Sequence, residues 1–208
     1  MSVAIPVLDE QELIGDCIEA LRQQSDPVDE IIVVDNGSTD DTVAIARAAP
    51  GVTVIEESRR GVTYARNTGV AAATGDIIAR IDADSICPPA WLARIERRFE
   101  RDPGLDLLTG DARFYGSSEL VHRLGETLYI GGMYWAVTPY LGHPPVFGSN
   151  FAMRRETWAE LSPEVHRGNG IHDDLDLSLH IRPWMNVELD RDLVVDISYR
   201  EEDRLYGD

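Results

Sequence analysis

Short apolar segments alternate with longer amphipathic ones through the first half of the chain, and this alternation constrains the fold more than any other feature. The expected strands are short and rich in β-branched residues, and they cover 3–7, 31–34, 52–55 and 76–81. The expected helices follow them at about 11–24, 39–49, 62–73 and 89–101. Asp9 is expected to cap the first helix, and Thr39 or Asp40 the second. Strands that alternate with helices predict an α/β fold with a mostly parallel central sheet flanked by helices.

The second half of the chain is less regular. Residues 105–114 are expected to form a further strand, and residues 127–153 contain no charged side chain. The uncharged stretch also holds Gly131, Gly132 and Pro139, which make it a poor transmembrane helix. We expect it to supply core and an aromatic pocket wall, with a membrane-facing or lipid-acceptor surface as the alternative. Its aromatic residues include Tyr129, Tyr134, Trp135 and Tyr140.

Length and net charge limit the classes of protein to which the chain can belong. The 208 residues suit one domain with a substantial core, and no linker or internal repeat divides them. The net charge of −18 argues against binding to nucleic acid or to an anionic membrane surface. All 19 basic residues are arginine, which either GC-rich coding or the acidic, lysine-free surface of a halophile explains.

The cysteines and the first residues bear on the compartment. Cys17 and Cys87 lie far apart and show no metal-finger or disulfide spacing, which favours a reducing compartment. The first residues lack the basic and apolar regions of a signal peptide. We therefore expect a cytoplasmic protein, with peripheral attachment at the inner membrane face as the alternative.

Polar clusters follow three of the expected strands. They are Asp9-Glu10, the segment 35–38 and Asp82-Ala83-Asp84. Ligands of parallel sheets bind beyond the carboxyl ends of the strands. Two carboxylates at positions i and i+2 of an extended chain point the same way, so Asp82 and Asp84 can converge on one Mg²⁺ or Mn²⁺ ion. Such an ion would stabilise the charge on a leaving diphosphate, whereas a solvated turn is the alternative for the triplet alone.

Three ordered blocks carry a resemblance to a known family. Residues 5–10 are similar to an opening Pro-x-x-Asn-Glu segment, with Asp9 in place of Asn. Residues 33–42 are similar to Val-Asp-Asp-Gly-Ser-x-Asp-x-Thr, and residues 61–69 to Gly-x-x-x-Ala-Arg-Asn-x-Gly. This last motif leads into the Asp-x-Asp triplet in family 2 glycosyltransferases, which the chain resembles over roughly residues 2–180.

The resemblance implies a GT-A fold and a donor of defined chemistry. A single domain over 1–208 would hold a nucleotide-sugar-binding half at about 1–114 and a smaller acceptor half at about 115–208. The implied activity is a metal-dependent inverting transfer of one sugar from a UDP- or GDP-sugar, with Mn²⁺ or Mg²⁺. The acceptor would be a hydroxyl group on a small molecule, a glycan or a lipid-linked sugar.

The resemblance also assigns residues to the donor. Pro6, Val7 and Glu10 would line the nucleotide pocket, and Asp35 would contact the base or ribose. Arg66 would lie near the nucleotide or its phosphates, with an ordinary surface ion pair on a helix as the alternative. The Asp-x-Asp triplet would complete the donor site, with Asp84 as the direct metal ligand, Asp82 near the ribose and metal, and Ala83 between them.

An inverting transfer needs a general base to take the proton of the acceptor hydroxyl. Residues 172–179 look like a Glu-Asp-x-Asp-Leu segment in which Asp173 replaces Glu. The match implies that Asp174 is the base and Asp173 its alternate, whereas Asp176 is structural. An acidic helix N-terminus is the alternative interpretation. His172 is either an auxiliary metal or phosphate contact or a plain polar residue.

The acceptor side is assigned by a weaker match. Residues 147–155 resemble a Gly-x-Asn-x-x-x-Arg stretch in which Gly148 would allow close backbone approach and Asn150 would bind sugar hydroxyls. A strand and turn leading into a helix is the alternative. Trp135 is a further acceptor-side candidate. The Gln-x-x-Arg-Trp motif of processive synthases is absent, since Arg182-Pro183-Trp184 matches it only faintly, and this favours transfer of a single sugar.

Two other functions compete with transfer. A sugar nucleotidyltransferase would want a Gly-rich phosphate loop near the first strand, and residues 6–15 do not contain one. The other is a non-catalytic sugar-nucleotide-binding protein, a degenerate transferase, and the intact acids at Asp82, Asp84 and Asp174 argue against it. The motifs therefore favour an active transferase.

Overall fold

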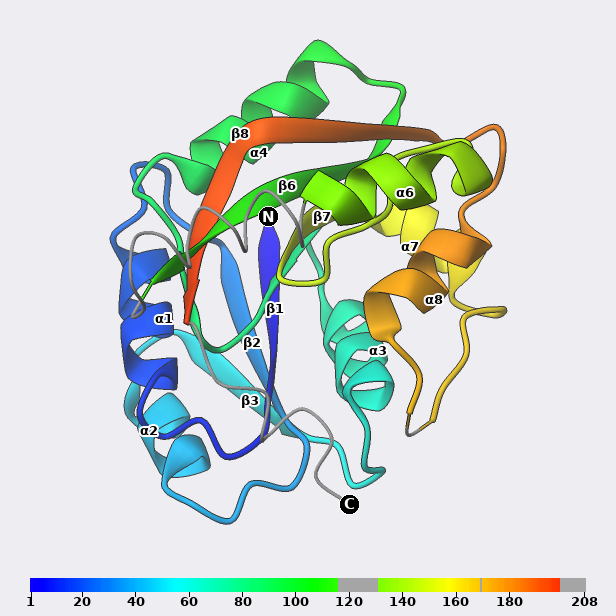
Figure 1. Cartoon of the computed structure of the whole chain (residues 1–208). Helices are drawn as coiled ribbons and strands as arrows, with labels where there is room; N and C mark the ends of the chain where they lie inside the picture. The colour runs from blue at the N-terminus through cyan, green and yellow to red at the C-terminus, as the bar shows by residue number, and fades with distance from the viewer. Residues whose placement is uncertain (116–130, 169, 199–208) are drawn as a thin grey trace.

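The described residues form a single sheet with helices on both faces. The computed structural model describes residues 1–115, 131–168 and 170–198 (Figure 1). Within these residues the sheet has eight strands in the order β3-β2-β1-β4-β7-β6-β8-β5. The strands are β1 Ser2–Val7, β2 Glu30–Asp35, β3 Val52–Glu56, β4 Ile77–Ile81, β5 Ser85–Ile86, β6 Leu105–Tyr115, β7 Asn150–Arg154 and β8 Asn186–Ser198. The helices are α1 Ile14–Arg22, α2 Thr42–Ala48, α3 Val62–Ala72, α4 Trp91–Arg101, α6 Gly131–Leu141, α7 Arg155–Leu161 and α8 Asp173–His180.

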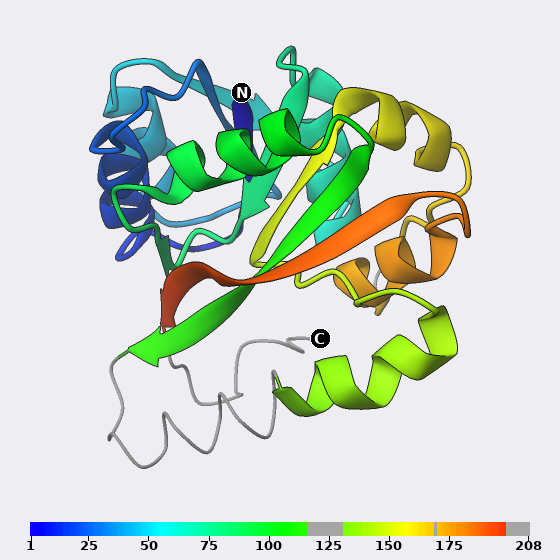
Figure 2. The same cartoon turned by 90° about the horizontal axis from the view of Figure 1, so that it is seen from above.

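The first four long strands are parallel, as the alternating pattern predicts. β1 pairs with β2 and β4, and β2 pairs with β3, all in parallel. The second half departs from this plan, because β7 lies antiparallel between β4 and β6. β8 then pairs in parallel with β6 and antiparallel with β5, and Figure 2 shows β6 and β8 side by side between α4 and α6. The α/β fold with a mostly parallel central sheet is confirmed.

Successive residues of the central strands face opposite layers of the core. Val33 points into the layer that α1 and α4 cover, whereas Ile32 and Val34 point into the layer that α3, α7 and α8 cover. All three side chains are buried, which explains why the sequence of β2 is an unbroken run of β-branched residues. Among the described residues, no helix combines the length and the apolar character that a membrane crossing requires.

Two helix starts differ from the sequence prediction. Asp9 does not cap the first helix: it adopts a left-handed φ of 53°, and its carboxylate accepts a hydrogen bond from the Thr39 N–H at 2.7 Å. The first helix begins only at Ile14, after a turn closed on the Glu10 carbonyl. The second helix begins at Thr42, whose N–H donates to the Asp40 carboxylate at 3.0 Å. The N-cap residue is Asp41, which makes no side-chain capping bond, so neither Thr39 nor Asp40 occupies the predicted cap and Asp40 supports the helix start from one residue before it.

A close backbone approach at Gly110 generates a stability prediction. The pairing of β6 with β8 shifts register between Thr109 and Asp111, and a Cβ at Gly110 would lie 2.3 Å from the Leu193 carbonyl oxygen and 2.2 Å from Asn150 Nδ2. Both atoms are tied into the core. Gly110→Ala should therefore lower the free energy of unfolding by about 1–3 kcal/mol, measured by urea denaturation. Gly132→Ala, where a Cβ meets nothing within 4 Å, is the control and should be neutral or slightly stabilising.

Candidate active site

The predicted donor acids gather where β1, β2 and β4 end. Val7 pairs with Asp35 across β1 and β2, and β4 continues from Ile81 into Asp82. The electrostatic surroundings of the buried Cys17 thiol indicate which of these acids lie close together. Burial most strongly raises the pKa of Cys17, and the charges of Cys87, Asp84, Asp82 and Glu10 raise it further. Three carboxylates from two strand ends therefore concentrate negative charge in one place.

Asp82 is held by two neighbours. Arg80 NH2 lies 2.7 Å from its Oδ1, and the Ser149 hydroxyl donates to its Oδ2. Its side chain keeps an exposed fraction of 34%, so the carboxylate still reaches the surface. Asp84 is half-buried, and its main-chain oxygen accepts a hydrogen bond from the Tyr115 hydroxyl at 3.2 Å. The donor set is all oxygen, which suits Mg²⁺ or Mn²⁺.

The other predicted donor residues contribute in different ways. Asp35 is buried, and its carboxylate accepts hydrogen bonds from the N–H groups of Gly37 and Ser38 at 3.2 and 2.9 Å. The side chains of Val7 and Ala83 pack in the core and are only 3% exposed, so a ligand can reach little beyond their main chains. Pro6 and Glu10 are half-buried.

Arg80 links this strand end to the start of α8. It is buried on β4, and its NH2 also lies 3.3 Å from Asp173 Oδ2. Burial opposes its charge, but Asp82 and Asp173 outweigh that effect and raise the pKa of Arg80. The predicted donor acids and the predicted base segment therefore share one ion-pair network. Arg80 was not among the residues predicted for the site. Its signal in the sequence is a charge inside the apolar strand Ile77-Ile78-Ala79-Arg80-Ile81, two residues before Asp82.

Asp174 lies in a setting that suits a proton acceptor. Burial and then the charge of Asp173 raise its pKa, against hydrogen bonds from the N–H groups of Leu175 and Gly148 and the charge of Arg80. Gly148 packs closely here, since a Cβ at this position would lie 2.6 Å from Arg80 NH1 and 3.3 Å from the Asp174 Cβ. The close approach expected at Gly148 is thus present, but it is to protein groups.

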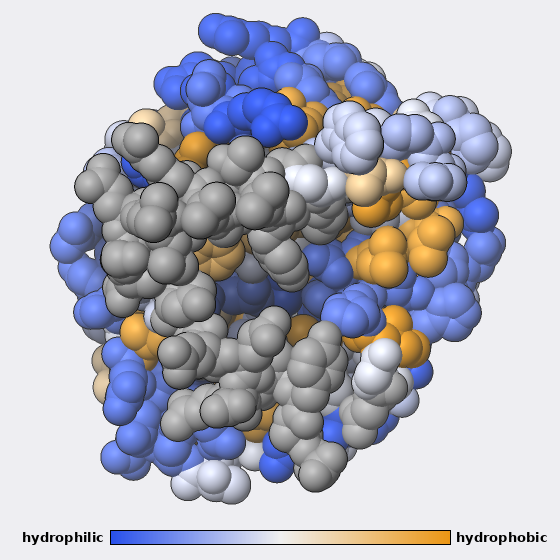
Figure 3. Space-filling view, viewed as in Figure 1, coloured by the Kyte–Doolittle hydropathy of each residue, from blue (hydrophilic) through white to orange (hydrophobic). Residues whose placement is uncertain are grey.

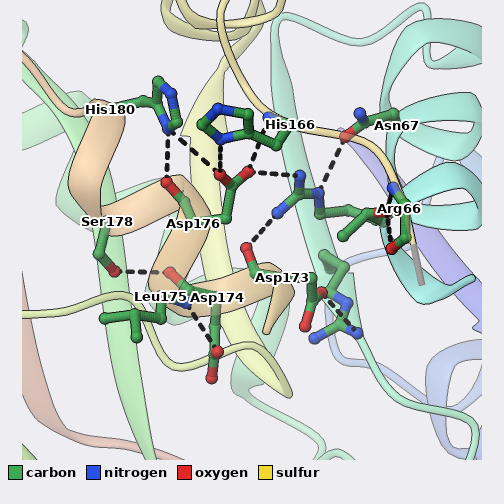
Figure 4. Close-up of polar contacts among 12 residues, drawn as sticks. Arg66, Asn67, His166, Asp173, Asp174, Leu175, Asp176, Ser178 and His180 are labelled. Carbon is green, nitrogen blue, oxygen red and sulfur yellow. Dashed lines mark hydrogen bonds and ion pairs between the residues drawn. The ribbon is translucent and has the colours of Figure 1, made fainter. Parts of the chain in front are cut away.

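Arg66 is not a surface ion pair, which was one of the two interpretations of this residue. Its side chain is 0% exposed on α3 and points to α8 (Figure 4). NH1 donates to the Asp173 main-chain oxygen, and NH2 lies 3.7 Å from Asp176 Oδ2. Burial lowers the pKa of Arg66 most strongly. In the structure Arg66 therefore holds the first turn of α8, and any contact with a phosphate stays a prediction.

Asn150 does not face a sugar, and this corrects the sequence prediction. Its side chain is fully buried, accepts a hydrogen bond from Trp91 Nε1 at 2.9 Å, and donates to the main-chain oxygens of Asp111 and Leu193 at 2.8 and 2.6 Å. These bonds tie β7 to α4, β6 and β8, and they use the carbonyl and amino groups of the side chain. Asn150 is a structural residue of the core.

The aromatic pocket wall is also wrong in part. Trp135 and Tyr140 are 83% and 92% exposed on α6, whereas Tyr134 is buried and its hydroxyl donates to the Gly110 carbonyl at 2.7 Å. Tyr129 lies outside the described residues. Figure 3 shows apolar side chains gathered over α8, where Leu175 and Leu179 are exposed. The uncharged stretch thus supplies core on one side of α6 and exposed aromatic surface on the other.

The core role of Asn150 can be measured. Asn150→Ala leaves the Trp91 N–H and two main-chain oxygens without their partner, and each buried polar group that loses its bond costs about 1–3 kcal/mol. We expect urea unfolding to show a loss of at least about 2 kcal/mol. Asn186→Ala is the matched control, because Asn186 Nδ2 makes one exposed bond to Asp102. Equal stabilities of the two variants would contradict the assignment.

Comparison with known proteins gives a family match over most of the chain. A family model described as "Glycosyl transferase family 2" matches residues 2–161. Glycosyltransferase AglE of Haloferax volcanii is 37% identical over 121 residues, which cover 55% of this chain and 40% of that protein. A glucosyl-3-phosphoglycerate synthase of Mycolicibacterium paratuberculosis is 41% identical over 96 residues, which cover 42% of this chain and 29% of that protein. The chain thus spans less than half the length of these curated relatives.

Solved structures support the fold. The glucosyl-3-phosphoglycerate synthase from Mycobacterium tuberculosis, crystallised with Mn²⁺, UDP and phosphoglyceric acid, matches with a TM-score of 0.72 and 27% identity over 98% of this chain and 72% of that chain. A mannosyltransferase from Pyrobaculum calidifontis, crystallised with GDP-Man and Mn²⁺, matches with a TM-score of 0.74 and 23% identity over 97% of this chain and 57% of that chain. The likeness to glycosyltransferase structures confirms the expected GT-A fold.

Proposed function

This chain belongs to glycosyl transferase family 2, and we propose that it is a metal-dependent inverting glycosyltransferase that moves one sugar from a nucleotide-diphosphate sugar to an acceptor hydroxyl. One observation carries the proposal. The ion pairs of Arg80 with Asp82 and Asp173 put one of the strand-end acids and the residue next to the candidate base, Asp174, on the same buried cation. A donor bound at the strand ends would then present its anomeric carbon toward the first turn of α8.

The donor side would be built by strand-end residues. Asp84 and Asp82 would hold Mn²⁺ or Mg²⁺, which supplies stabilisation of the charge on the leaving diphosphate. Pro6, Glu10 and Asp35 would receive the nucleotide, which we propose to be UDP or GDP. Support comes from the oxygen-only donor set and from the Mn²⁺ and nucleotides bound by the two solved relatives.

The base would be Asp174 rather than Asp173. Asp173 is ion-paired with Arg80, and its main-chain oxygen accepts from Arg66, so its charge is held in place. Asp174 has a raised pKa, because burial and the neighbouring charge of Asp173 disfavour its ionised form. A carboxylate with a raised pKa is a stronger proton acceptor for the attacking hydroxyl. We assign proton transfer to Asp174 and positioning to Asp173.

The acceptor would approach from the side of α6 and α8. Exposed Trp135 on α6 and the apolar side chains of α8 offer a surface for a sugar ring or an apolar group. A small molecule, a glycan or a lipid-linked sugar would each fit this chemistry.

The free, buried thiols of Cys17 and Cys87 fit the reducing, cytoplasmic setting that we propose for the reaction.

A non-catalytic sugar-nucleotide-binding protein is the second candidate. The engagement of both Asp82 oxygens, by Arg80 and by Ser149, favours it, because a metal ion would have to share or displace these partners. Slow release of nucleotide diphosphate from the donor in the presence of Mn²⁺ separates the two. An active transferase uses water as a poor acceptor and releases the diphosphate, whereas a binding protein does not.

The metal assignment predicts the behaviour of Asp84→Asn. Binding of UDP or GDP, measured by isothermal titration calorimetry, should be at least about tenfold tighter with Mn²⁺ than without it in the unaltered chain. Asp84→Asn should abolish that difference, because a neutral amide is a weaker ligand for a hard cation. Asp16→Asn, on the exposed face of α1, is the control and should retain it. Equal nucleotide affinity with and without Mn²⁺ in the unaltered chain would contradict the proposal that the activity depends on a metal ion.

The base assignment predicts a pH profile. The proton acceptor is the ionised carboxylate, so Mn²⁺-dependent donor hydrolysis should fall as pH drops through the raised pKa of Asp174. The fall should begin above the range of an ordinary aspartate, whose pKa is about 3.9. Asp174→Asn should keep nucleotide affinity, lose at least about 100-fold in rate and lose this acid limb. An unchanged rate in Asp174→Asn would move the base elsewhere.

A further inference from the structure

Three side chains outside the proposed reaction meet at α8. Asp176 and His180 lie one turn apart on this helix, and His166 comes from the segment between α7 and α8 (Figure 4). Their potential ligand atoms all lie within 4.8 Å of one another. Across residues 1–115, 131–168 and 170–198, this is the one group of three or more His, Cys, Asp or Glu residues gathered in this way.

The Asp176 carboxylate divides its two oxygens between different partners. Oδ2 accepts a hydrogen bond from the His166 main-chain N–H at 3.0 Å and lies 3.7 Å from Arg66 NH2. Oδ1 faces the two imidazole rings, at 2.7 Å from His166 Nδ1 and 3.5 Å from His180 Nδ1. One carboxylate oxygen and two imidazole nitrogens therefore face one another, with the cationic neighbour on the opposite oxygen.

These separations are close to those of a tetrahedral metal site. Zinc binds His nitrogen and carboxylate oxygen at about 2.0–2.2 Å, which puts neighbouring ligand atoms of a tetrahedron about 3.3 Å apart. The observed 2.7 and 3.5 Å lie on either side of that value. The two rings meet edge to face, with centroids 4.9 Å apart and planes at 65°, so both nitrogens can turn toward one point.

We propose that His166, Asp176 and His180 form a Zn²⁺ site that is separate from the strand-end acids. Two imidazoles and one carboxylate suit zinc, whereas oxygen-only ligands suit Mg²⁺ and Mn²⁺. The side chains of Asp176, His180 and His166 are 4%, 15% and 67% exposed. The site thus has a buried floor and an open side at His166, where an ion enters and water fills the fourth position.

Three existing contacts must change or be tolerated when the ion binds. His166 Nδ1 and Asp176 Oδ1 are hydrogen-bonded at 2.7 Å, so the His166 proton must lie on Nε2 before both atoms can bind the ion. His180 Nδ1 donates to the Asp176 main-chain oxygen at 2.7 Å, so its proton must move to Nε2 and this hydrogen bond is lost. A metal bond to imidazole replaces it. Arg66 keeps its charge balanced, because it also lies beside the charge of Asp173 and donates to that residue's main-chain oxygen.

The site would act on the fold around the candidate base. It joins the segment before α8 to Asp176 in the first turn of that helix and His180 in its last turn, and the first turn also carries Asp173 and Asp174. Binding that occurs only in the folded state stabilises the fold. Zinc is therefore expected to raise the melting temperature without nucleotide or Mn²⁺.

The experiment is a Zn²⁺ titration of the full chain after treatment with a chelator, followed by calorimetry and thermal unfolding. We expect one ion per chain, a higher melting temperature, and the same binding in Asp84→Asn, which removes the donor-site ligand. His166→Ala and His180→Ala should each weaken Zn²⁺ binding at least about tenfold. His166 is largely exposed, so its variant should fold. His143→Ala is the control, because the His143 ring contacts only its neighbouring Pro144 carbonyl among the polar contacts described.

X-ray absorption at the zinc edge gives an independent readout. It should show imidazole scattering from two histidines with nitrogens at about 2.0–2.1 Å. Failure to bind one ion, binding that survives both histidine variants, or binding that disappears in Asp84→Asn would each overturn the proposal. None of these outcomes bears on nucleotide binding or donor hydrolysis, so the zinc site and the proposed sugar transfer are tested independently.

Discussion

The buried charge of Arg80 is the constraint around which the candidate site is arranged. A guanidinium on a central strand has lost nearly all contact with water, and such a charge is tolerated only when it is paired. Its partners are Asp82, which directly follows its own strand, and Asp173, at the start of α8. Removing one partner of a buried ion pair destabilises the fold by more than the intact pair stabilises it, because the other charge is left buried without a partner. The position of α8 is thereby tied to the chemistry of β4.

Arg66 and Gly148 serve the same arrangement from two sides. Arg66 reaches the first turn of α8 from α3, and Gly148 approaches Arg80 so closely that a side chain there would collide with the guanidinium. Asp173 is therefore fixed by two arginines, while Asp174, next to it, is left with a raised pKa. Adjacent carboxylates acquire different properties from their surroundings, as acid–base sites require.

The sequence predicted the parallel half of the fold well, because local patterns decide it. A β-branched run such as Ile31–Val34 is typical of a strand buried on both faces. Side-chain roles were harder, since they depend on partners distant in sequence. Asp9 looked like a cap but binds Thr39, and Asn150 looked like a sugar ligand but completes a core network with Trp91. Neither partner is visible in the local pattern.

The place of β7 in the sheet has a consequence for how the chain is made. β7 pairs antiparallel along β4, with Ile81 opposite Asn150, so it covers the edge of the strand that leads into Asp82. Until residues 150–154 leave the ribosome, β4 is an unprotected sheet edge, and such edges invite pairing with other chains. Assembly of the site must also await this distant partner, which slows folding. A nascent or truncated chain that ends before β7 would therefore carry its donor acids on an edge open to aggregation.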